Sequence, residues 1–332
     1  MFNTIAMLRL IFGSYSVRYC APQAMVHITT GTMGVLLPST NPCTVIVPGL
    51  TINSEAIMQA IDTEKCTCMI ASPTLCRNIL AHPNRHKYDL SSLQYLSITG
   101  TSMQPEFLSM LETELGVGRV GQEYGMTEIG NFLTCNLDVD HDDDRRHTSI
   151  GRCLPHMEIK IVDNNGTVVP IGAEGEIWAR GYSIMSCYDN DRERTAEMIT
   201  DDRWLRTGDL ARMDDDGYLF FVGRKKEMII RGSTNIYPME IERVILEHPS
   251  VADVQVFSIP DPLIDEAVCA FVKLKPEMKC EVDELKMFLS DKLTPYKIPE
   301  HIRFVDDFTR NVMGKVAKYK LAEEMIHILK SS

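Results

Sequence analysis

Two hydrophobic periods alternate along the first half of the chain. Residues 54–66 and 74–81 carry apolar side chains at helical spacing, while residues 68–71 between them are short and wholly apolar. Residues 96–98 again have a strand pattern, and Pro105 then opens another amphipathic helix. This alternation predicts a parallel-sheet α/β layer.

After residue 149 the pattern changes to short β-like runs. They cover residues 158–162, 176–179 and 218–222 and are separated by Asn- and Asp-rich turns that end in glycine. We therefore expect a small, mostly antiparallel barrel or sheet in this part of the chain.

Beyond Gly223, helix and strand patterns are mixed, which predicts a compact α+β domain. Apolar spacing favours helices at 239–248, 282–292 and after Gly314, and strands at 254–259, 268–274 and 302–305. The patterns thus divide the chain into an unassigned segment 1–20, an α/β part 21–148, a β-rich subdomain 149–223 and a C-terminal domain 224–332.

The first 20 residues have a composition of their own. They include Arg9, Arg18 and several apolar and Ser residues, and the first acidic residue of the chain is Glu55. Such a segment is typical of a mitochondrial transit peptide, and equally of sequence left from a truncated or alternative start. The first interpretation predicts a mitochondrial protein, and the second a cytoplasmic one.

Composition indicates an ordinary soluble globular protein. The chain has 332 residues, 44% hydrophobic and 24% charged, enough for two or three packed units. Its net charge of -12 argues against a nucleic-acid partner, because phosphate binding needs clustered Lys and Arg. The 10 cysteines show neither metal-ligand spacing nor a disulfide framework, and no apolar stretch is long enough to span a membrane.

The run Gly121-Gln122-Glu123-Tyr124-Gly125-Met126-Thr127-Glu128 combines groups suited to a nucleotide and a metal. The Tyr124 ring offers a flat face to a purine, and Gly125 lets the backbone approach the base. Thr127 can hydrogen-bond a phosphate oxygen, and Glu128 is a hard oxygen ligand for Mg²⁺. Taken alone, the run is also compatible with a surface turn carrying a solvated Glu.

A second pair of residues is suited to gripping a ribose from both sides. Asp209 lies in the run Trp204 to Leu210 and Arg224 opens the run Arg224 to Gly232, each beside a glycine. The carboxylate would accept hydrogen bonds from the ribose hydroxyls, and the guanidinium would donate to them. The alternatives are an exposed turn Asp and a surface Arg.

These blocks, in this order, resemble the adenylate-forming (AMP-binding) superfamily, which includes acyl-CoA synthetases, peptide-synthetase adenylation domains and luciferases. Residues 175–185 and 230–238 look most like the medium-chain, family member 2 type of acyl-CoA synthetase, although Cys187 replaces the usual Gly before Tyr188. The resemblance implies an adenylate-forming enzyme fold that is incomplete: an α/β large-domain remnant, a small β-barrel-like subdomain and a compact, mobile α+β C-terminal domain.

The resemblance also implies site residues. The expected nucleotide-binding residues are Gly100, Thr101, Glu123, Tyr124, Gly125, Met126, Asp209 and Arg224. The expected catalytic residues are Thr127, Glu128 as the Mg²⁺ ligand, and Lys315, which would contact the substrate carboxylate and the α-phosphate. Around Gly100 the signal is weak, because Ser102 as the N-cap of the helix at Pro105 explains much of it.

Further residues match the family's hinge and its CoA tunnel. Lys226 takes the hinge position, where free backbone torsions matter more than a reactive side chain. Gly232, Ser233 and Asn235 fall in the loop that lines the pantetheine tunnel. Ser233 and Thr234 depart from the usual residues there, and Thr309 replaces a usual Pro before the Gly314-Lys315 block.

The run from Thr29 to Gly34 invites interpretation as the family's phosphate loop, but no Pro-Lys-Gly follows and the distance to Tyr124 is too short. The spacing fits the next family block, in which His27 enters the acyl pocket; a buried, hydrogen-bonded His is an equal alternative. The resemblance therefore covers residues 22–325 and leaves the phosphate loop outside the sequence.

Three functions are compatible with these observations. The first is an acyl-CoA synthetase that uses ATP, Mg²⁺ and CoA to activate a medium-chain fatty acid or another small carboxylate through an acyl-adenylate, releasing AMP and pyrophosphate. The second is a catalytically silent fragment or pseudoenzyme that binds AMP, an acyl-adenylate or a partner. The third is adenylation with transfer to a carrier protein or an oxidative step, which the CoA-ligase-like loop after Arg231 disfavours.

Overall fold

The computed structural model describes residues 17–39, 42–100, 103–136, 145–232, 234–310 and 316–331. The chain forms two compact units, one of Met1–Thr207 with Ala211–Phe221 and the other of Gly208–Leu210 with Val222–Ser332. Among the described residues, no helix combines the length and the apolar character needed to cross a membrane.

The first unit contains the predicted parallel sheet. Its strand order is β2-β1-β3-β4-β5, and these described strands pair with one another in parallel. The strands are β1 (Val17–Cys20), β2 (Cys43–Ile46), β3 (Cys68–Ala71), β4 (Tyr95–Ile98) and β5 (Val120–Gln122). Because β1 is an inner strand, the sheet begins before the predicted boundary at residue 21; residues 1–16 of the predicted transit segment lie outside the described residues.

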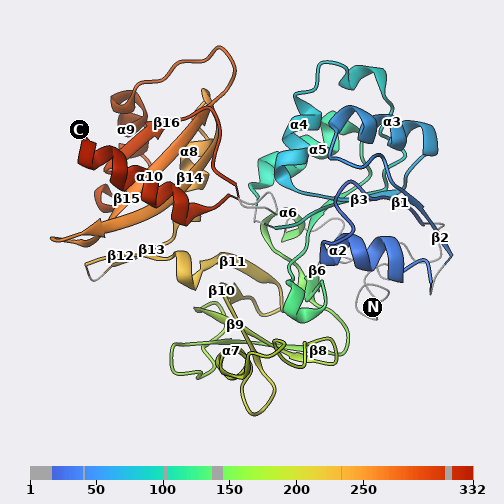
Figure 1. Cartoon of the computed structure of the whole chain (residues 1–332), viewed down its shortest axis with the longest axis horizontal. Helices are drawn as coiled ribbons and strands as arrows, with labels where there is room; N and C mark the ends of the chain where they lie inside the picture. The colour runs from blue at the N-terminus through green and yellow to red at the C-terminus, as the bar shows by residue number, and fades with distance from the viewer. Residues whose placement is uncertain are drawn as a thin grey trace. The chain divides into compact units, whose positions relative to one another are not determined.

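Three amphipathic helices cover one face of this sheet (Figure 1): α3 (Ser54–Glu64), α4 (Pro73–Leu80) and α5 (Pro105–Leu115). The Asn53 and Ser72 side chains cap the first two helices by accepting main-chain N–H groups. The N-cap of α5 is Gln104, with no side-chain cap bond, so the prediction of Ser102 as N-cap is wrong. Apolar helix faces packed on an apolar sheet explain why the periodicity predicted this layer so well.

The other face of the sheet is covered by shorter elements. The helix α2 (Ile28–Gly31) runs into a π-helical turn, η1 (Thr32–Leu36), and buries Met33 and Leu37 against β1, β3 and β4. The remaining short elements of this part are η2 (Arg85–Lys87), η3 (Thr127–Ile129), β6 (Thr134–Cys135), α6 (Arg145–Thr148) and β7 (Arg152–Cys153).

The predicted β-rich subdomain is a four-stranded sheet of order β11-β10-β9-β8. Its strands are β8 (Met157–Val162), β9 (Glu174–Gly181), β10 (Leu205–Met213) and β11 (Leu219–Arg224), with α7 (Arg192–Met198) between β9 and β10. The sequence patterns did not reveal β10, because Thr207 and Asp209 occupy buried positions where an apolar residue would complete the alternation.

The C-terminal part is the expected α+β domain, with sheet order β13-β12-β15-β14 and β16 beside β15. Helices α8 and α9 pack on one face of this sheet and α10 on the other. The elements are η5 (Lys225–Glu227), β12 (Ile229–Arg231), β13 (Thr234–Ile236), α8 (Pro238–Leu246), β14 (Val251–Asp261), β15 (Asp265–Leu274), α9 (Val282–Ser290), η6 (Pro295–Lys297), β16 (His301–Phe304) and α10 (Lys318–Ser331).

Candidate functional site

The turn that carries Glu128 begins where β5 ends. A Cβ on Gly125 would lie 1.7 Å from the Asn131 carbonyl oxygen, so only glycine fits as the chain folds back past itself. The short helix η3 then presents Thr127 as an exposed residue and Glu128 as a half-buried one, and Gly130 at φ 78° closes the turn. Gly125 thus serves the turn itself, in addition to its predicted role beside a base.

Tyr188 anchors the Glu128 carboxylate, and the sequence patterns did not identify it. Its hydroxyl donates to Glu128 Oε1 at 2.8 Å, and the Met185 amide donates to the Glu128 carbonyl at 2.8 Å. Burial, together with Glu128, raises the pKa of Tyr188, which keeps its hydroxyl a donor. A carboxylate fixed through one oxygen is a hard ligand held in one orientation, and this donor chemistry fits Mg²⁺.

We expect Tyr188→Phe to weaken metal binding about threefold to tenfold, because the carboxylate loses its orienting hydrogen bond while the ring stays in place. Mn²⁺ in place of Mg²⁺, followed by electron paramagnetic resonance with ATP present, would measure the change. Tyr182→Phe removes another hydroxyl from a nearby, more exposed ring and is the matched control. Equal Mn²⁺ affinity in both variants would show that Tyr188 does not position Glu128.

The Tyr124 side chain is buried. It is 9% exposed, and its centroid lies 6.3 Å from that of Phe221. Main-chain hydrogen bonds with Thr134 hold its backbone, and Met126 packs against the same apolar cluster. Little of this residue is accessible, so the predicted contact of Tyr124 with a purine remains a prediction that concerns a small surface.

Glu123 differs most from its expected role. Its side chain is buried, with the hydroxyls of Tyr95 and Ser97 in contact with its two carboxyl oxygens. Burial raises the pKa of Glu123 to about 8, although Tyr95 and Arg119 act in the opposite direction. The Glu123 carboxyl group therefore has a structural role beneath the turn. Only the main chain of Glu123 could still make the predicted nucleotide contact, which stays a prediction.

Gln122, at the end of β5, ties three segments together. Its amide oxygen accepts from the Met103 amide at 2.7 Å, and its amide nitrogen donates to the His147 carbonyl at 2.9 Å. The first bond reaches the segment that follows Gly100, which has φ 98° and follows β4. Gln122 thereby fixes the two predicted nucleotide-binding segments to each other, although Thr101 lies outside the described residues.

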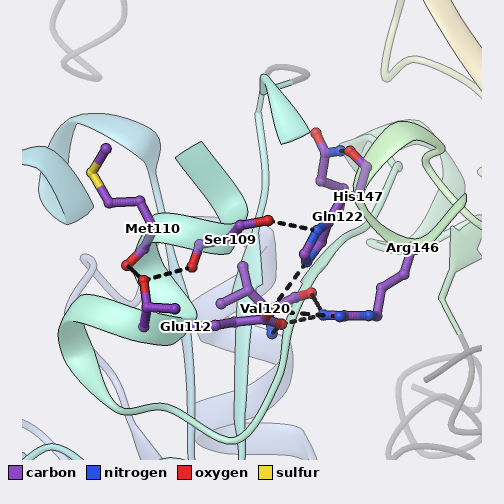
Figure 2. Close-up of polar contacts among 8 residues, drawn as sticks. Ser109, Met110, Glu112, Val120, Gln122, Arg146 and His147 are labelled. Atoms are coloured by element: carbon purple, nitrogen blue, oxygen red, sulfur yellow. Dashed lines mark hydrogen bonds and ion pairs between the residues drawn. The ribbon is translucent and has the colours of Figure 1, made fainter. Parts of the chain in front are cut away.

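A half-buried ion pair between Arg146 and Glu112 also supports β5. Figure 2 shows Arg146 and His147 reaching from α6 toward Glu112 on α5 and toward β5. The Val120 amide donates to Glu112 Oε1 at 2.8 Å, and Arg146 also donates to the Val120 carbonyl at 3.2 Å. Burial alone would raise the pKa of Glu112, but His147, Arg146 and the Val120 amide outweigh it and lower the pKa to about 2.

We expect Glu112→Gln to destabilise the fold by about 1–3 kcal/mol at neutral pH, because it leaves the half-buried guanidinium of Arg146 without its anion. The depressed pKa stabilises the native state above the ordinary value of 4.5, and this contribution is lost as pH falls toward about 2. Urea unfolding at about pH 3 to 7 should show this loss of free energy of unfolding at acid pH in the parent and not in the variant. Glu114 lies on the same helix as Glu112, is exposed and pairs with Arg85. The control Glu114→Gln should therefore change the free energy of unfolding little.

Asp209 and Arg224 lie together, as the ribose prediction requires. Arg224 Nε is 3.4 Å from Asp209 Oδ1, and the side chains are 40% and 12% exposed respectively. Arg224 also lies 3.6 Å from Glu227. A nearly buried carboxylate beside a more accessible guanidinium offers an acceptor and a donor to a vicinal diol from adjacent positions.

The hinge candidate Lys226 is exposed and lies on η5, directly after β11. Its neighbour Glu227 is held by Lys318 at 3.2 Å, and Lys318 also contacts Glu242 at 2.8 Å. Burial would lower the pKa of Lys318, but these two carboxylates raise it, so the cation persists inside the domain. The segment after Lys226 is thus anchored to α8 and α10, whereas the hinge role of Lys226 remains a prediction.

The predicted CoA-tunnel segment includes the antiparallel pair β12 and β13, and its role in binding CoA remains a prediction. Gly232 has φ 58° in the turn between β12 and β13, and Asn235 is exposed on β13. Ser233 and the predicted catalytic Lys315 lie outside the described residues.

The segment from Thr29 to Gly34 is helical, which agrees with rejecting it as a phosphate loop. His27 is half-buried, and its Nδ1 accepts from the Thr29 amide at 3.3 Å to cap α2. This contact favours a structural role for His27 and leaves its predicted place in an acyl pocket as a prediction.

A second polar cluster joins His248, Cys280 and Glu284, whose ligand-type atoms lie within 4.8 Å of one another. His248 Nδ1 accepts from the Ser250 amide at 3.3 Å, so the proton of the neutral ring lies on Nε2, which faces Glu284 at 3.9 Å. A protonated nitrogen is a donor and not a metal ligand. We infer that this cluster has a structural role and connects the end of α8 with the start of α9.

Comparisons with known proteins identify the family. The AMP-binding enzyme profile matches residues 1–189, more than half of the chain, and the AMP-binding enzyme C-terminal domain matches residues 240–315. The chain is a member of the AMP-binding enzyme family. The predicted superfamily is therefore confirmed.

Two sequence relatives and one solved structure agree with this family assignment. The medium-chain acyl-CoA ligase ACSF2, mitochondrial, of Danio rerio is 37% identical over 309 residues, 93% of this chain and 51% of the relative. The putative acyl-CoA synthetase YngI of Bacillus subtilis is 36% identical over 317 residues, 95% of this chain and 57% of the relative. The amide bond synthetase McbA from Marinactinospora thermotolerans superposes with a TM-score of 0.87 at 29% identity, over 98% of this chain and 64% of that one.

The predicted fold class is confirmed by this superposition, as is the likeness to the medium-chain type of acyl-CoA ligase. The chain spans about half the length of the curated relatives that it matches. The activity of a whole enzyme is therefore a proposal for this chain.

Proposed function

We propose that the chain acts as an ATP-dependent, AMP-forming ligase that joins a small carboxylic acid to CoA through an acyl-adenylate. The observation that carries this function is the Asp209–Arg224 pair at 3.4 Å, which supplies an acceptor and a donor for a ribose. The names of the Danio rerio and Bacillus subtilis relatives support CoA as the acceptor, and the first also supports a medium-chain fatty acid as the substrate.

The residues of this chain would act by positioning and by charge. Asp209 and Arg224 would hold the ribose, while Thr127 and Glu128 would face the phosphates. When bound, Mg²⁺ would neutralise charge on the phosphate oxygens. In-line attack by a carboxylate on the α-phosphate needs no covalent enzyme group, so a cation such as Lys315 and correct alignment would be sufficient for the chain's part in the reaction.

The test is acid-dependent release of AMP. The purified chain is mixed with ATP, Mg²⁺ and CoA, and a panel of carboxylic acids of different chain length is added in turn. We expect AMP and an acyl-CoA in equal amounts with at least one acid, and no AMP without acid. Absence of AMP with every acid would refute ligase activity for this chain.

A binding-only function is a second candidate, and the observation that favours it is the coverage of only about half of the relatives. In that case an acyl-adenylate analogue would raise the melting temperature, whereas ATP would hardly change it. Equal stabilisation by both ligands would contradict it.

A different acyl acceptor is a third candidate, because McbA, named as an amide bond synthetase, has the same fold. Product analysis with CoA, with an amine and with neither would separate the two acceptors. Acyl-CoA as the product would exclude the amide alternative.

For the compartment, we propose the mitochondrion, which the name of the Danio rerio relative supports. A fluorescent fusion of the chain should co-localise with a mitochondrial marker, and diffuse cytoplasmic fluorescence would contradict this proposal.

A further inference from the structure

A row of alternating charges leads from the Asp209–Arg224 pair into the second compact unit of the chain. Arg224 lies between two carboxylates, with Nε 3.4 Å from Asp209 Oδ1 and Nη1 3.6 Å from Glu227 Oε1. The other Glu227 oxygen, Oε2, is 3.2 Å from Lys318 Nζ, which is also 2.8 Å from Glu242 Oε1. We call these five residues the charge row. All of them belong to the same unit, so the row links parts of one packed body.

The far end of the charge row is anchored to the main chain. Glu242 lies on α8, and its Oε1 accepts the Val256 amide of β14 at 2.8 Å in addition to the Lys318 ammonium. The side chains of Glu242 and Lys318 are 17% and 23% exposed respectively. Burial lowers the pKa of Lys318, but Glu242 and Glu227 outweigh burial and raise the pKa, so the cation persists. Lys318 is therefore a fixed charge and not a mobile surface side chain.

Glu227 is held from both sides, because each of its oxygens faces a different cation. It ends η5, the short helix directly after β11, and its side chain is 30% exposed. A long side chain that is free to rotate loses conformational entropy when it adopts a single geometry. With Lys318 beside one oxygen, the Glu227 carboxylate has one favoured position, and its second oxygen then faces Arg224.

Arg224 is the member of the charge row that a ligand can reach most easily. Its side chain is 40% exposed, against 12% for Asp209. The guanidinium is planar, and its two anions approach different nitrogens, Nε and Nη1. Two such contacts fix the plane of the group, whereas Asp209 alone would leave it free to turn about one contact. A donor that is oriented before the ligand arrives binds more tightly, because less rotamer entropy is lost on binding.

We propose that Glu227 and Lys318 are positioning residues for nucleotide binding. Lys318 fixes the Glu227 carboxylate, and this carboxylate orients the Arg224 guanidinium toward a ribose. Neither residue touches the nucleotide, so each acts only through Arg224. This role rests on the proposed function, since it requires a ribose at Asp209 and Arg224.

The probe is a sulfamoyl analogue of an acyl-adenylate, compared with its 2′-deoxy form by calorimetric titration of the full-length chain. We expect Glu227→Gln to weaken binding of the ribose analogue about threefold to tenfold and to reduce the preference for it over the 2′-deoxy form. In an Arg224→Met background the same change should have no further effect, because Glu227 acts only through the guanidinium. A merely structural role would lower the melting temperature without changing the preference for ribose.

The second positioning residue is tested in the same titration. Lys318→Met should give the same loss as Glu227→Gln, and the two changes together should be no worse than either one. Lys318→Arg keeps the cation and should bind within about threefold of the parent. If Lys318→Met fails to fold because Glu242 loses its cation, Glu227→Gln still decides the question, since the Glu227 side chain is more exposed.

The double variant Lys292→Met with Glu247→Gln is the matched control. These two residues form an exposed ion pair at 2.7 Å in the same unit and outside the charge row, so the variant should bind like the parent. An unchanged ribose preference in Glu227→Gln, or a further loss from this change in the Arg224→Met background, would overturn the positioning role alone. Absence of any ribose preference in the parent would refute the ribose contacts themselves, and the positioning role with them.

Discussion

Replacement of Asp209 by alanine is expected to weaken binding of an acyl-adenylate analogue by about 100-fold or more. Each hydrogen bond to a charged group contributes about 1.5–3 kcal/mol, and the carboxylate would accept two from the ribose. The loss is large because Asp209 is 12% exposed in its side chain and pairs with Arg224, so little water can replace it. Calorimetric titration with a sulfamoyl analogue of the adenylate would measure the affinity.

A 2′-deoxy analogue makes this experiment specific for the ribose. In the parent protein, loss of the 2′-hydroxyl should reduce affinity about tenfold, whereas in Asp209→Ala the two analogues should bind alike. Asp201→Ala, an exposed carboxylate before β10, serves as the control and should bind like the parent. An Asp209→Ala affinity within threefold of the parent would show that Asp209 does not hold the nucleotide.

Glu123→Gln is expected to have the largest effect on stability, and in the stabilising direction at alkaline pH. The pKa of Glu123 is raised by burial from 4.5 to about 8. Between these values the unfolded chain is ionised and the native state keeps its proton, so the free energy of unfolding falls as pH rises. The free energy of unfolding falls by about 1.4 kcal/mol per pH unit between these two pKa values, which is several kcal/mol in total. Above about pH 8 the decrease levels off.

Glutamine has the shape of the protonated acid and stays neutral, so the variant should lose this part of the pH dependence. We expect its melting temperature to exceed that of the parent at pH 8 and to approach it near pH 5. Thermal unfolding across this range would measure the difference, with Glu106→Gln, an exposed carboxyl on α5, as the control. Parallel pH profiles for the parent and Glu123→Gln would contradict a protonated Glu123 in the native state.

Local sequence patterns predicted most helices and strands, because an element with one buried face has apolar residues at a regular spacing. Helices α3, α4 and α5 have apolar positions that follow one face, and the strand β3 is a continuous apolar run. The sequence pattern did not predict the strand β10, because the polar residues Thr207 and Asp209 occupy buried positions in it and interrupt the apolar alternation. A site residue placed inside a strand interrupts the very pattern by which strands are recognised.

The candidate site was only partly predictable for a related reason. The Tyr188 hydroxyl meets a carboxylate 60 residues earlier in the chain, and no local spacing reports such a contact. Glu123 and Glu128 belong to one motif, yet Glu123 is buried and Glu128 is half-buried. Sequence order does not say which side chains of a motif face inward when the backbone leaves regular structure.

The sequence by itself determined the family, the order of the domains and the presence of Asp209, Arg224 and Glu128, because these depend on residue type and spacing. Only the tertiary structure decided that Asp209 and Arg224 lie 3.4 Å apart, that Glu123 is buried and that the Tyr188 hydroxyl contacts Glu128. Those properties depend on which distant segments pack together, and burial then sets the pKa values and the hydrogen-bond partners.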